Sequence, residues 1–150
     1  MIMHDMQANE ISLQGFQLVR GQMFSRQTEP AMTIWYGSAS FNMACYAALN
    51  DCTSIQMLVN SDDRKILIRP CPSKDKDAVT WISDIATKKH KKLECSKLMH
   101  QLFDLWGLKK EYHYRANGKL VISDQKVMLM FDFSEPEAWY GLKMVTGLDN

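Results

Sequence analysis

Closely spaced cysteine pairs are absent from this chain of 150 residues, which holds four cysteines in all. Zinc ribbons and thioredoxin-like redox sites need Cys-x-x-Cys pairs, so neither class is expected. His90, Cys95 and His100 follow one another at gaps of five residues, which do not bring all three side chains onto one face of a helix. We therefore expect reduced structural thiols, no metal site and no cofactor.

Long apolar runs are missing as well. No stretch approaches the roughly 18 to 20 apolar residues that cross a bilayer. The first ten residues contain His4, Asp5 and Glu10 and lack the apolar centre of a secretory signal. Both absences predict a cytoplasmic protein that does not contact a membrane.

Catalytic sequence motifs are also absent. The chain contains neither the phosphate-binding G-x-x-x-x-G-K-[ST] motif nor the G-x-S-x-G motif of serine hydrolases. Asp124 and Asp132 lie at the ends of expected strands, so an acidic metal cluster for nuclease chemistry is the open alternative. We expect a protein that is not an enzyme.

Positive charge, by contrast, is concentrated in the middle of the chain. Residues 64–119 hold fourteen of the eighteen Lys and Arg but six of the seventeen acidic residues, so this segment carries +8 and the remainder −7. Clustered cations attract polyanions through their summed field even when the net charge is small. DNA is therefore the expected partner.

The candidate DNA-binding site consists of the basic residues of this segment. They are Lys88, Lys89, His90, Lys91, Lys92, Lys97, Lys109, Lys110, Arg115 and Lys119. If the chain doubles back, these side chains form one surface that binds phosphate without reading the base sequence. For residues 88–92 taken alone, a solvated loop is the alternative.

Tyr112, His113, Tyr114 and Arg115 form an aromatic and basic strand. Such strands can stack unpaired bases. Alternation places Tyr112 and Tyr114 on one face, which we expect to pack in the core, while His113 and Arg115 point outward. This orientation favours contact with duplex phosphates over base stacking.

The hydrophobic period changes from two to about 3.6 and back, and it does so twice. Residues 15–72 are expected to form strands over 16–20, 32–36, 55–59 and 65–69, with a helix over 41–49. Ser40 is the expected N-cap of that helix, and residues 60–63 form the turn of the hairpin that follows.

Residues 73–150 repeat this order. The expected elements are strands over 79–83 and 91–95, a helix over 96–106, a hairpin of 112–115 with 119–123, and a strand over 127–133. Gly107 ends the helix, Asn117-Gly118 is the hairpin turn, and a capping box at Ser134 opens a last helix that runs to 145. Helical spacing is the alternative for residues 78–85.

These patterns predict an α+β fold of two tandem ββαββ-like repeats with antiparallel sheets, related by a pseudo-twofold axis and followed by a C-terminal helix. Residues 1–14 are expected to be a flexible N-terminal segment. The two repeats, 15–72 and 73–150, are expected to pack into one compact unit.

Four segments carry a resemblance to a known group of proteins. They are FNMACYAALNDCTSIQMLVNSDDRKILIRPCP, ECSKLMHQLFDLWGL, YHYRANGKLVIS and FDFSEPEAWY. Over residues 15–140 the chain resembles small proteins of Gram-positive bacterial mobile elements and phages that are called integrase-like or hypothetical. The chain is too short for a complete tyrosine-recombinase domain, so Tyr140 is interpreted as a helix-surface aromatic. The resemblance implies an accessory role with DNA.

A protein-interaction module is the competing hypothesis. An exposed apolar patch could be built from four tryptophans, Trp35, Trp81, Trp106 and Trp139. The basic segment of one copy would then meet the acidic parts of another in a homodimer without nucleic-acid affinity.

Overall fold

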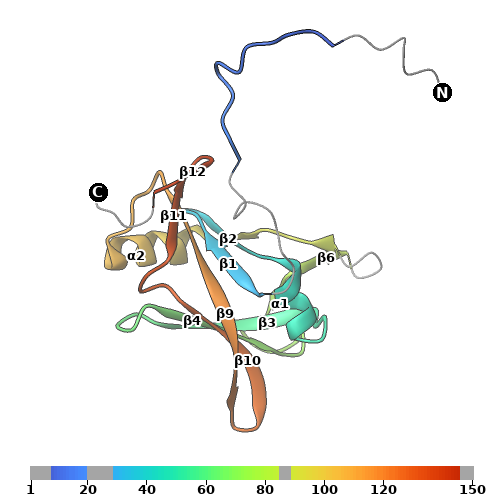
Figure 1. The fold of residues 1–150 in the computed structure, drawn as a ribbon. Coiled ribbons are helices and arrows are strands. Elements are labelled where there is room, and N and C mark those ends of the chain that lie inside the picture. The colour runs from blue at the N-terminus through green and yellow to red at the C-terminus, as the bar shows by residue number, and fades with distance from the viewer. Residues whose placement is uncertain (1–7, 20–28, 85–88, 146–150) are drawn as a thin grey trace, which may run out of the picture.

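Residues 8–19, 29–84 and 89–145 are described by the computed structural model. Among the described residues, strands far outweigh the two helices, and most strands form one antiparallel sheet that curls into a half-barrel (Figure 1). The expected α+β fold of two ββαββ-like repeats is therefore wrong. No helix of the described part is long and apolar enough to cross a membrane.

The sheet follows one path from edge to edge. In spatial order its strands are β5 (Val79–Thr80), β3 (Ser54–Asn60), β4 (Lys65–Pro70), β10 (Lys126–Asp132), β9 (His113–Ser123), β1 (Ala31–Ile34), β2 (Ser38–Phe41) and β8 (Leu93–Glu94). β11 (Glu137–Tyr140) pairs with β9 and with β12 (Lys143–Met144). β6 (Ile82–Asp84) and β7 (Lys89–His90) form a separate pair. The helices are α1 (Met43–Ala48) and α2 (Ser96–Trp106).

Strands from the two halves of the sequence pair with one another. β1 pairs with β9, β4 with β10, and β2 with β8. Neither half therefore completes a sheet of its own, which is why the tandem-repeat expectation fails. Local periodicity identifies strands, but it does not say which strands become neighbours.

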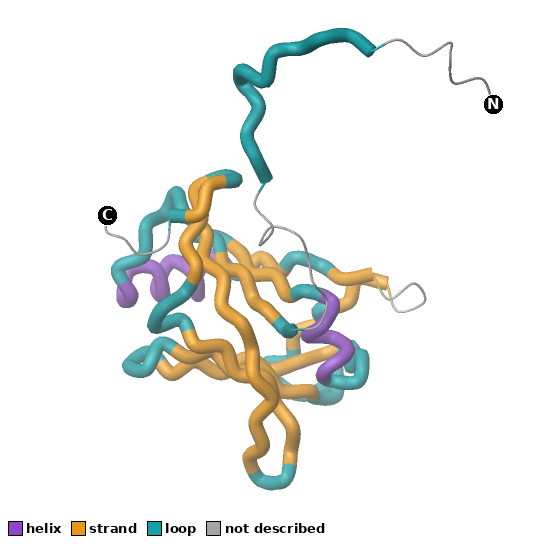
Figure 2. The backbone as a smooth tube through the Cα atoms, viewed as in Figure 1, coloured by secondary structure: helices purple, strands orange, loops and turns teal. Residues whose placement is uncertain are grey.

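β9 is one continuous strand that changes partners near its middle (Figure 2). Residues 114–117 pair with β1, and residues 118–123 pair with β10. The turn expected at Asn117-Gly118 does not form, since the Gly118 N–H donates to the Pro30 carbonyl at 2.8 Å and the strand runs on. The chain reverses instead at Asp124 and Gln125, whose φ angles are 52° and 63°.

The expected C-terminal helix is wrong. Asp132 Oδ1 accepts a hydrogen bond from the Ser134 N–H at 2.9 Å, and residues 137–140 form β11. β11 satisfies the free edge of β9, whose backbone groups a helix would have left without partners. Tyr140 consequently lies on a strand, with its side chain exposed.

Several local expectations are confirmed. The helix over 96–106 forms with the expected bounds, and Gly107 ends it in the left-handed conformation at φ 64°. β3 and β4 form the expected hairpin. The strand over 79–83 forms in two pieces, β5 and β6, interrupted at Trp81, and the strand over 91–95 is limited to β8.

Two expectations near the N-terminus are wrong. Residues 16–19 are exposed and lie outside any strand, and residue 20 lies outside the described residues. Ser40 belongs to β2, while Asn42 occupies the N-cap position of α1 and uses its side chain to accept from the Ala31 N–H at 3.0 Å. Residues 8–19 run away from the sheet (Figure 1).

A single core lies on the inner face of the half-barrel. It combines side chains from the strands of both halves with the buried faces of α1 and α2. Fully buried members include Ile34, Ile66, Trp81, Phe103 and Phe131. Because this core ties every part of the sheet together, it fixes the β1–β2 turn and the loop after α2 relative to one another.

Candidate functional site

Two consecutive aromatic residues stand at the β1–β2 turn. The Trp35 N–H donates to the Ser38 carbonyl at 2.8 Å, which places Tyr36 and Gly37 at the tip. Trp35 and Tyr36 are both half-buried, and each has a lysine ammonium over its ring. This arrangement makes the turn the centre of the candidate site.

Trp35 belongs to a stack of three rings on the sheet. Its ring centroid is 5.5 Å from that of His113, which in turn lies 6.4 Å from Trp139 at an interplanar angle of 8°. The Lys92 Nζ lies 4.1 Å from the Trp35 centroid. Cation and ring attract each other there through the ring quadrupole.

The surroundings of His113 favour its neutral form within this stack. Burial, and then the nearby charge of Lys92, lower the pKa of its imidazole. A protonated His113 would place a second cation beside Lys92 on a half-buried surface. The permanent positive charge at Trp35 therefore comes from Lys92.

Tyr36 contacts the opposite wall of the site. Its ring stacks on His100 of α2 with a centroid distance of 3.9 Å and an interplanar angle of 15°. The Lys110 Nζ, from the loop that follows α2, lies 5.3 Å from the Tyr36 centroid. The turn, the helix and the loop thus meet at one ring.

The loop after α2 is held in place by Tyr114. The Lys109 N–H donates to the Tyr114 hydroxyl at 2.9 Å, and the Lys109 Nζ lies 5.3 Å from the Tyr112 centroid. Tyr114 is buried, as expected, whereas Tyr112 is half-buried. Lysines 109 and 110 are therefore carried by a loop with a fixed backbone.

Five of the expected cations are exposed on the two segments whose Lys92 and Lys110 contact the rings of this turn. They are Lys91, Lys92, Lys97, Lys109 and Lys110. Lys97 follows Ser96, whose hydroxyl donates to the Gly37 carbonyl at 3.4 Å. Within the described ranges none of the five forms an ion pair with a carboxylate, so their charge is free to attract an anion.

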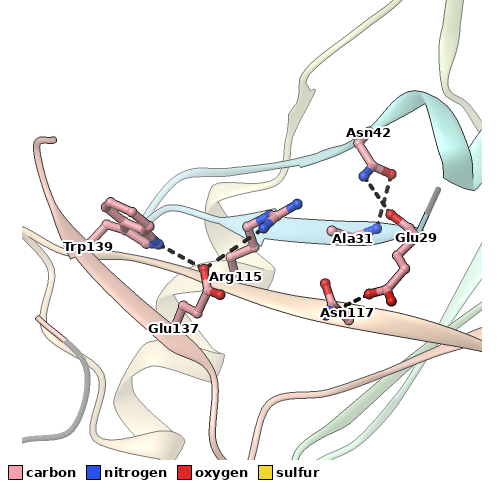
Figure 3. A network of polar contacts seen from close by, with 7 residues as sticks. All are labelled: Glu29, Ala31, Asn42, Arg115, Asn117, Glu137 and Trp139. Atoms are coloured by element: carbon pink, nitrogen blue, oxygen red, sulfur yellow. Dashed lines mark hydrogen bonds and ion pairs between the residues drawn. The ribbon is translucent and has the colours of Figure 1, made fainter. Parts of the chain in front are cut away.

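The other expected site residues are placed differently. Lys88 lies outside the described residues, as do the side chains of Lys89 and His90. Arg115 Nη1 is 3.9 Å from Glu137 Oε1, which also accepts from Trp139 Nε1 at 3.2 Å (Figure 3). Arg115 is therefore half-buried beside Glu137 on the sheet, and its guanidinium is not one of the unpaired cations.

Lys119 lies on a hairpin arm, which we define as residues 119–128 of β9 and β10. The arm projects from the body of the half-barrel, away from the β1–β2 turn (Figures 1 and 2). Hydrogen bonds from Ser134 lower the pKa of the Asp132 carboxyl, and Lys65 and Lys119 lower it further. Lys119 therefore lies near the Asp132 carboxylate, on the arm, and does not join the cations at the turn.

A pocket of about 460 Å³ opens between the turn and the end of α2. Its lining comprises Tyr36, His100, Gln101, Phe103, Asp104, Gly107, Leu108 and Lys110. Small-ligand pockets span roughly 300 to 1,000 Å³, so the space is large enough for a small ligand. Within the described residues no group of three His, Cys, Asp or Glu could hold a metal ion.

Sequence reasoning missed the aromatic half of this site. Tyr36 and His100 were not among the expected binding residues, and Trp35 was assigned to an apolar patch. A signal was present, since two consecutive aromatics at the end of a strand must face opposite sides, and one of them then points away from the core.

The chain matches no protein-family model, no curated protein and no solved structure.

Proposed function

We propose that this protein is a non-catalytic DNA-binding protein that contacts phosphate through the five exposed lysines around the β1–β2 turn. The observation that carries the proposal is the pair of cation–ring contacts on adjacent residues, Lys92 over Trp35 at 4.1 Å and Lys110 over Tyr36 at 5.3 Å. The cytoplasmic, accessory role implied by the resemblance to mobile-element proteins belongs to the same proposal.

Charge and chemistry both support phosphate binding at this place. Lysines bound to phosphate release condensed counterions, which supplies most of the affinity of sequence-independent binding. The lysines come from two segments, residues 91–97 and 109–110, and none of the five is paired with a carboxylate of the described part. Rings beside the cations provide surfaces on which bases or sugars can pack.

The test is a combined Lys92→Ala and Lys110→Ala variant. Fluorescence anisotropy with a labelled 20-base-pair duplex and with a single strand of the same sequence, each from 50 to 200 mM salt, gives the affinity and its salt slope. Loss of two phosphate contacts should lower the slope of log K against log salt by about 1.8 for the duplex and about 1.4 for the single strand.

The matched control removes the same charge elsewhere. Lys74 and Lys76 are exposed in the loop between β4 and β5, so Lys74→Ala with Lys76→Ala changes the net charge equally. This control should keep the wild-type slope. Equal slopes for the two double variants would show that net charge alone governs binding and would overturn the proposed site.

A homodimer interface is the second candidate, and the hairpin arm favours it. Leu120, Ile122 and Val127 are exposed and share one face of the arm. Among the described residues, 119–123 pair only with β10 and 126–128 only with β9, so both edges of the arm are open. Exposed apolar strands with open edges favour pairing with another chain.

The tryptophan patch does not support this second candidate. Trp81, Trp106 and Trp139 are buried, and the Trp81 and Trp106 indole N–H groups donate to backbone carbonyls. Light scattering of the wild type and of Ile122→Glu across protein concentrations tests the arm. A dimer that the substitution separates supports the second candidate, and a wild-type monomer at every concentration excludes it.

A further inference from the structure

We propose that the pocket between the β1–β2 turn and α2 binds a guanine base of single-stranded nucleic acid. This inference rests on the proposed nucleic-acid binding and adds the strandedness and the base. Three features of the pocket support it, namely its rings, its polar edge and its cation.

The rings provide a stacking surface. Tyr36 and His100 are parallel at 3.9 Å, and Phe103 meets Tyr36 edge to face with centroids 5.5 Å apart. His100 is exposed and lines the pocket, so a base that enters can extend the Tyr36–His100 stack. Stacking of a base on a protein ring contributes about 1 to 3 kcal/mol and accepts any base.

The polar edge of the pocket provides selectivity. Asp104 lies one helical turn after His100 on α2, and Gln101 directly follows His100 in the sequence. Both Asp104 and Gln101 line the pocket. The Asp104 and Gln101 side chains are exposed, and neither forms a hydrogen bond or ion pair within the described residues. A carboxylate accepts two parallel N–H bonds. Guanine presents two adjacent donors, N1–H and N2–H, on its Watson–Crick edge.

The cation of the pocket can hold the backbone of the same nucleotide. Lys110 lines the pocket and lies 5.3 Å from the Tyr36 ring, so its ammonium can reach a phosphate next to a stacked base. Lys92, over the neighbouring Trp35, can take the next phosphate along the strand. Two phosphates and one base would then be bound across a single turn.

The geometry favours a single strand over a duplex. In a duplex the Watson–Crick edge is paired and the base is stacked on its neighbours, so the base must be extruded to enter a pocket. An unpaired guanine needs no such step. The duplex can still contact the lysines through its phosphates, but without using the pocket.

The experiment compares three labelled twelve-nucleotide strands. They are oligo-dT, oligo-dT with one central guanine, and oligo-dT with one central hypoxanthine, which keeps N1–H but lacks the N2 amino group. We expect the wild type to bind the guanine strand about tenfold more tightly than the hypoxanthine strand, because a hydrogen bond to a charged acceptor is lost.

Asp104→Asn is the diagnostic variant, and Glu111→Gln is the matched control, an exposed carboxylate outside the pocket lining. The guanine preference should disappear in Asp104→Asn and persist in Glu111→Gln, with circular dichroism showing both variants folded. Salt-sensitive binding of all three strands with equal affinity would overturn the guanine pocket while leaving the proposed function standing. Absence of binding to every strand and duplex at 50 mM salt would overturn both.

Discussion

The Phe131 ring lies directly against Gly118 across the β9–β10 pair. A Cβ built on Gly118 would stand 2.6 Å from Cε1 of Phe131, closer than carbon atoms approach in folded proteins. The contact occurs where β9 leaves β1 and begins to pair with β10. Gly118 therefore allows the core to close at the point where the two parts of the sheet join.

Gly118→Ala should lower the free energy of unfolding by about 1 to 3 kcal/mol, because the added methyl must displace a buried ring. Urea unfolding followed by tryptophan fluorescence measures the change. Gly37→Ala is a milder control, since its Cβ would be 3.4 Å from the Ser96 hydroxyl. In a Phe131→Leu background the cost of Gly118→Ala should shrink, and an unchanged cost would show that the ring is not the cause.

Gln125→Gly should stabilise the protein by about 0.5 to 1 kcal/mol. Asp124 and Gln125 both have positive φ angles, a conformation that glycine adopts without steric cost and other residues adopt with strain. The converse change is Gly141→Ala, at φ 61° with no atom within 4 Å of a Cβ, which should destabilise by a similar amount. Urea midpoints that do not move in opposite directions would contradict this account of the turns.

His113 should make stability depend on pH. Burial, and then Lys92, lower the pKa of its imidazole in the folded protein, whereas the unfolded chain binds a proton near about pH 6.5. The unfolded state then binds more protons, so the contribution of His113 to stability is present above about pH 6.5 and declines as pH falls through the folded pKa. Urea unfolding between pH 7.5 and 5 should show this decline, and His113→Gln should reduce it.

An NMR titration of the His113 imidazole separates the two causes. Lys92→Ala removes the neighbouring cation and should move the pKa of His113 upward, toward its ordinary value. Lys97→Ala removes an exposed cation that does not contribute to the shift, and it should leave that pKa in place. Equal titration curves for the wild type and Lys92→Ala would place Lys92 away from the imidazole in solution.

The four cysteines, all free, should react with iodoacetamide at different rates at pH 8. Burial raises the pKa of Cys45 to about 12 and that of Cys52 to about 11. Cys45 is fully buried, and at this pKa about one thiol in ten thousand is the reactive thiolate. Cys71 is partly exposed and should be alkylated first, with Cys45 protected until the chain unfolds. Peptide mass spectrometry at timed intervals measures the order, and early labelling of Cys45 would contradict the burial.

Local sequence features determined the elements whose signals lie within a few residues. The α2 helix follows from one apolar stripe and from Gly107, which ends it in the left-handed conformation. The β3–β4 hairpin follows from two alternating runs around a polar turn. Tyr114 faces the core because alternation on a strand assigns its side, whichever strands become its neighbours.

The sequence did not determine the C-terminal element or the main hairpin turn. Ser134 and Glu137 match a capping box, and Asn117-Gly118 matches a two-residue turn, yet both lie in or beside β-strands. At the C-terminal element, pairing with the free edge of β9 outweighed the local preference for a helix. At Asn117-Gly118, the packing of Phe131 over Gly118 outweighed the local preference for a turn. Such long-range contacts cannot be read from a window of neighbouring residues.

The candidate site likewise has features that follow from the sequence and features that depend on long-range contacts. The concentration of cations between residues 64 and 119 is already visible in the amino-acid sequence, because charge is a property of composition. The folded arrangement of the strands brings Lys92 and Lys110 to adjacent rings at the β1–β2 turn, places Arg115 beside Glu137, and sets Lys119 apart on the arm. The physical reason is that pairing between distant strands, driven by burial of one shared core, fixes which charged segments become neighbours.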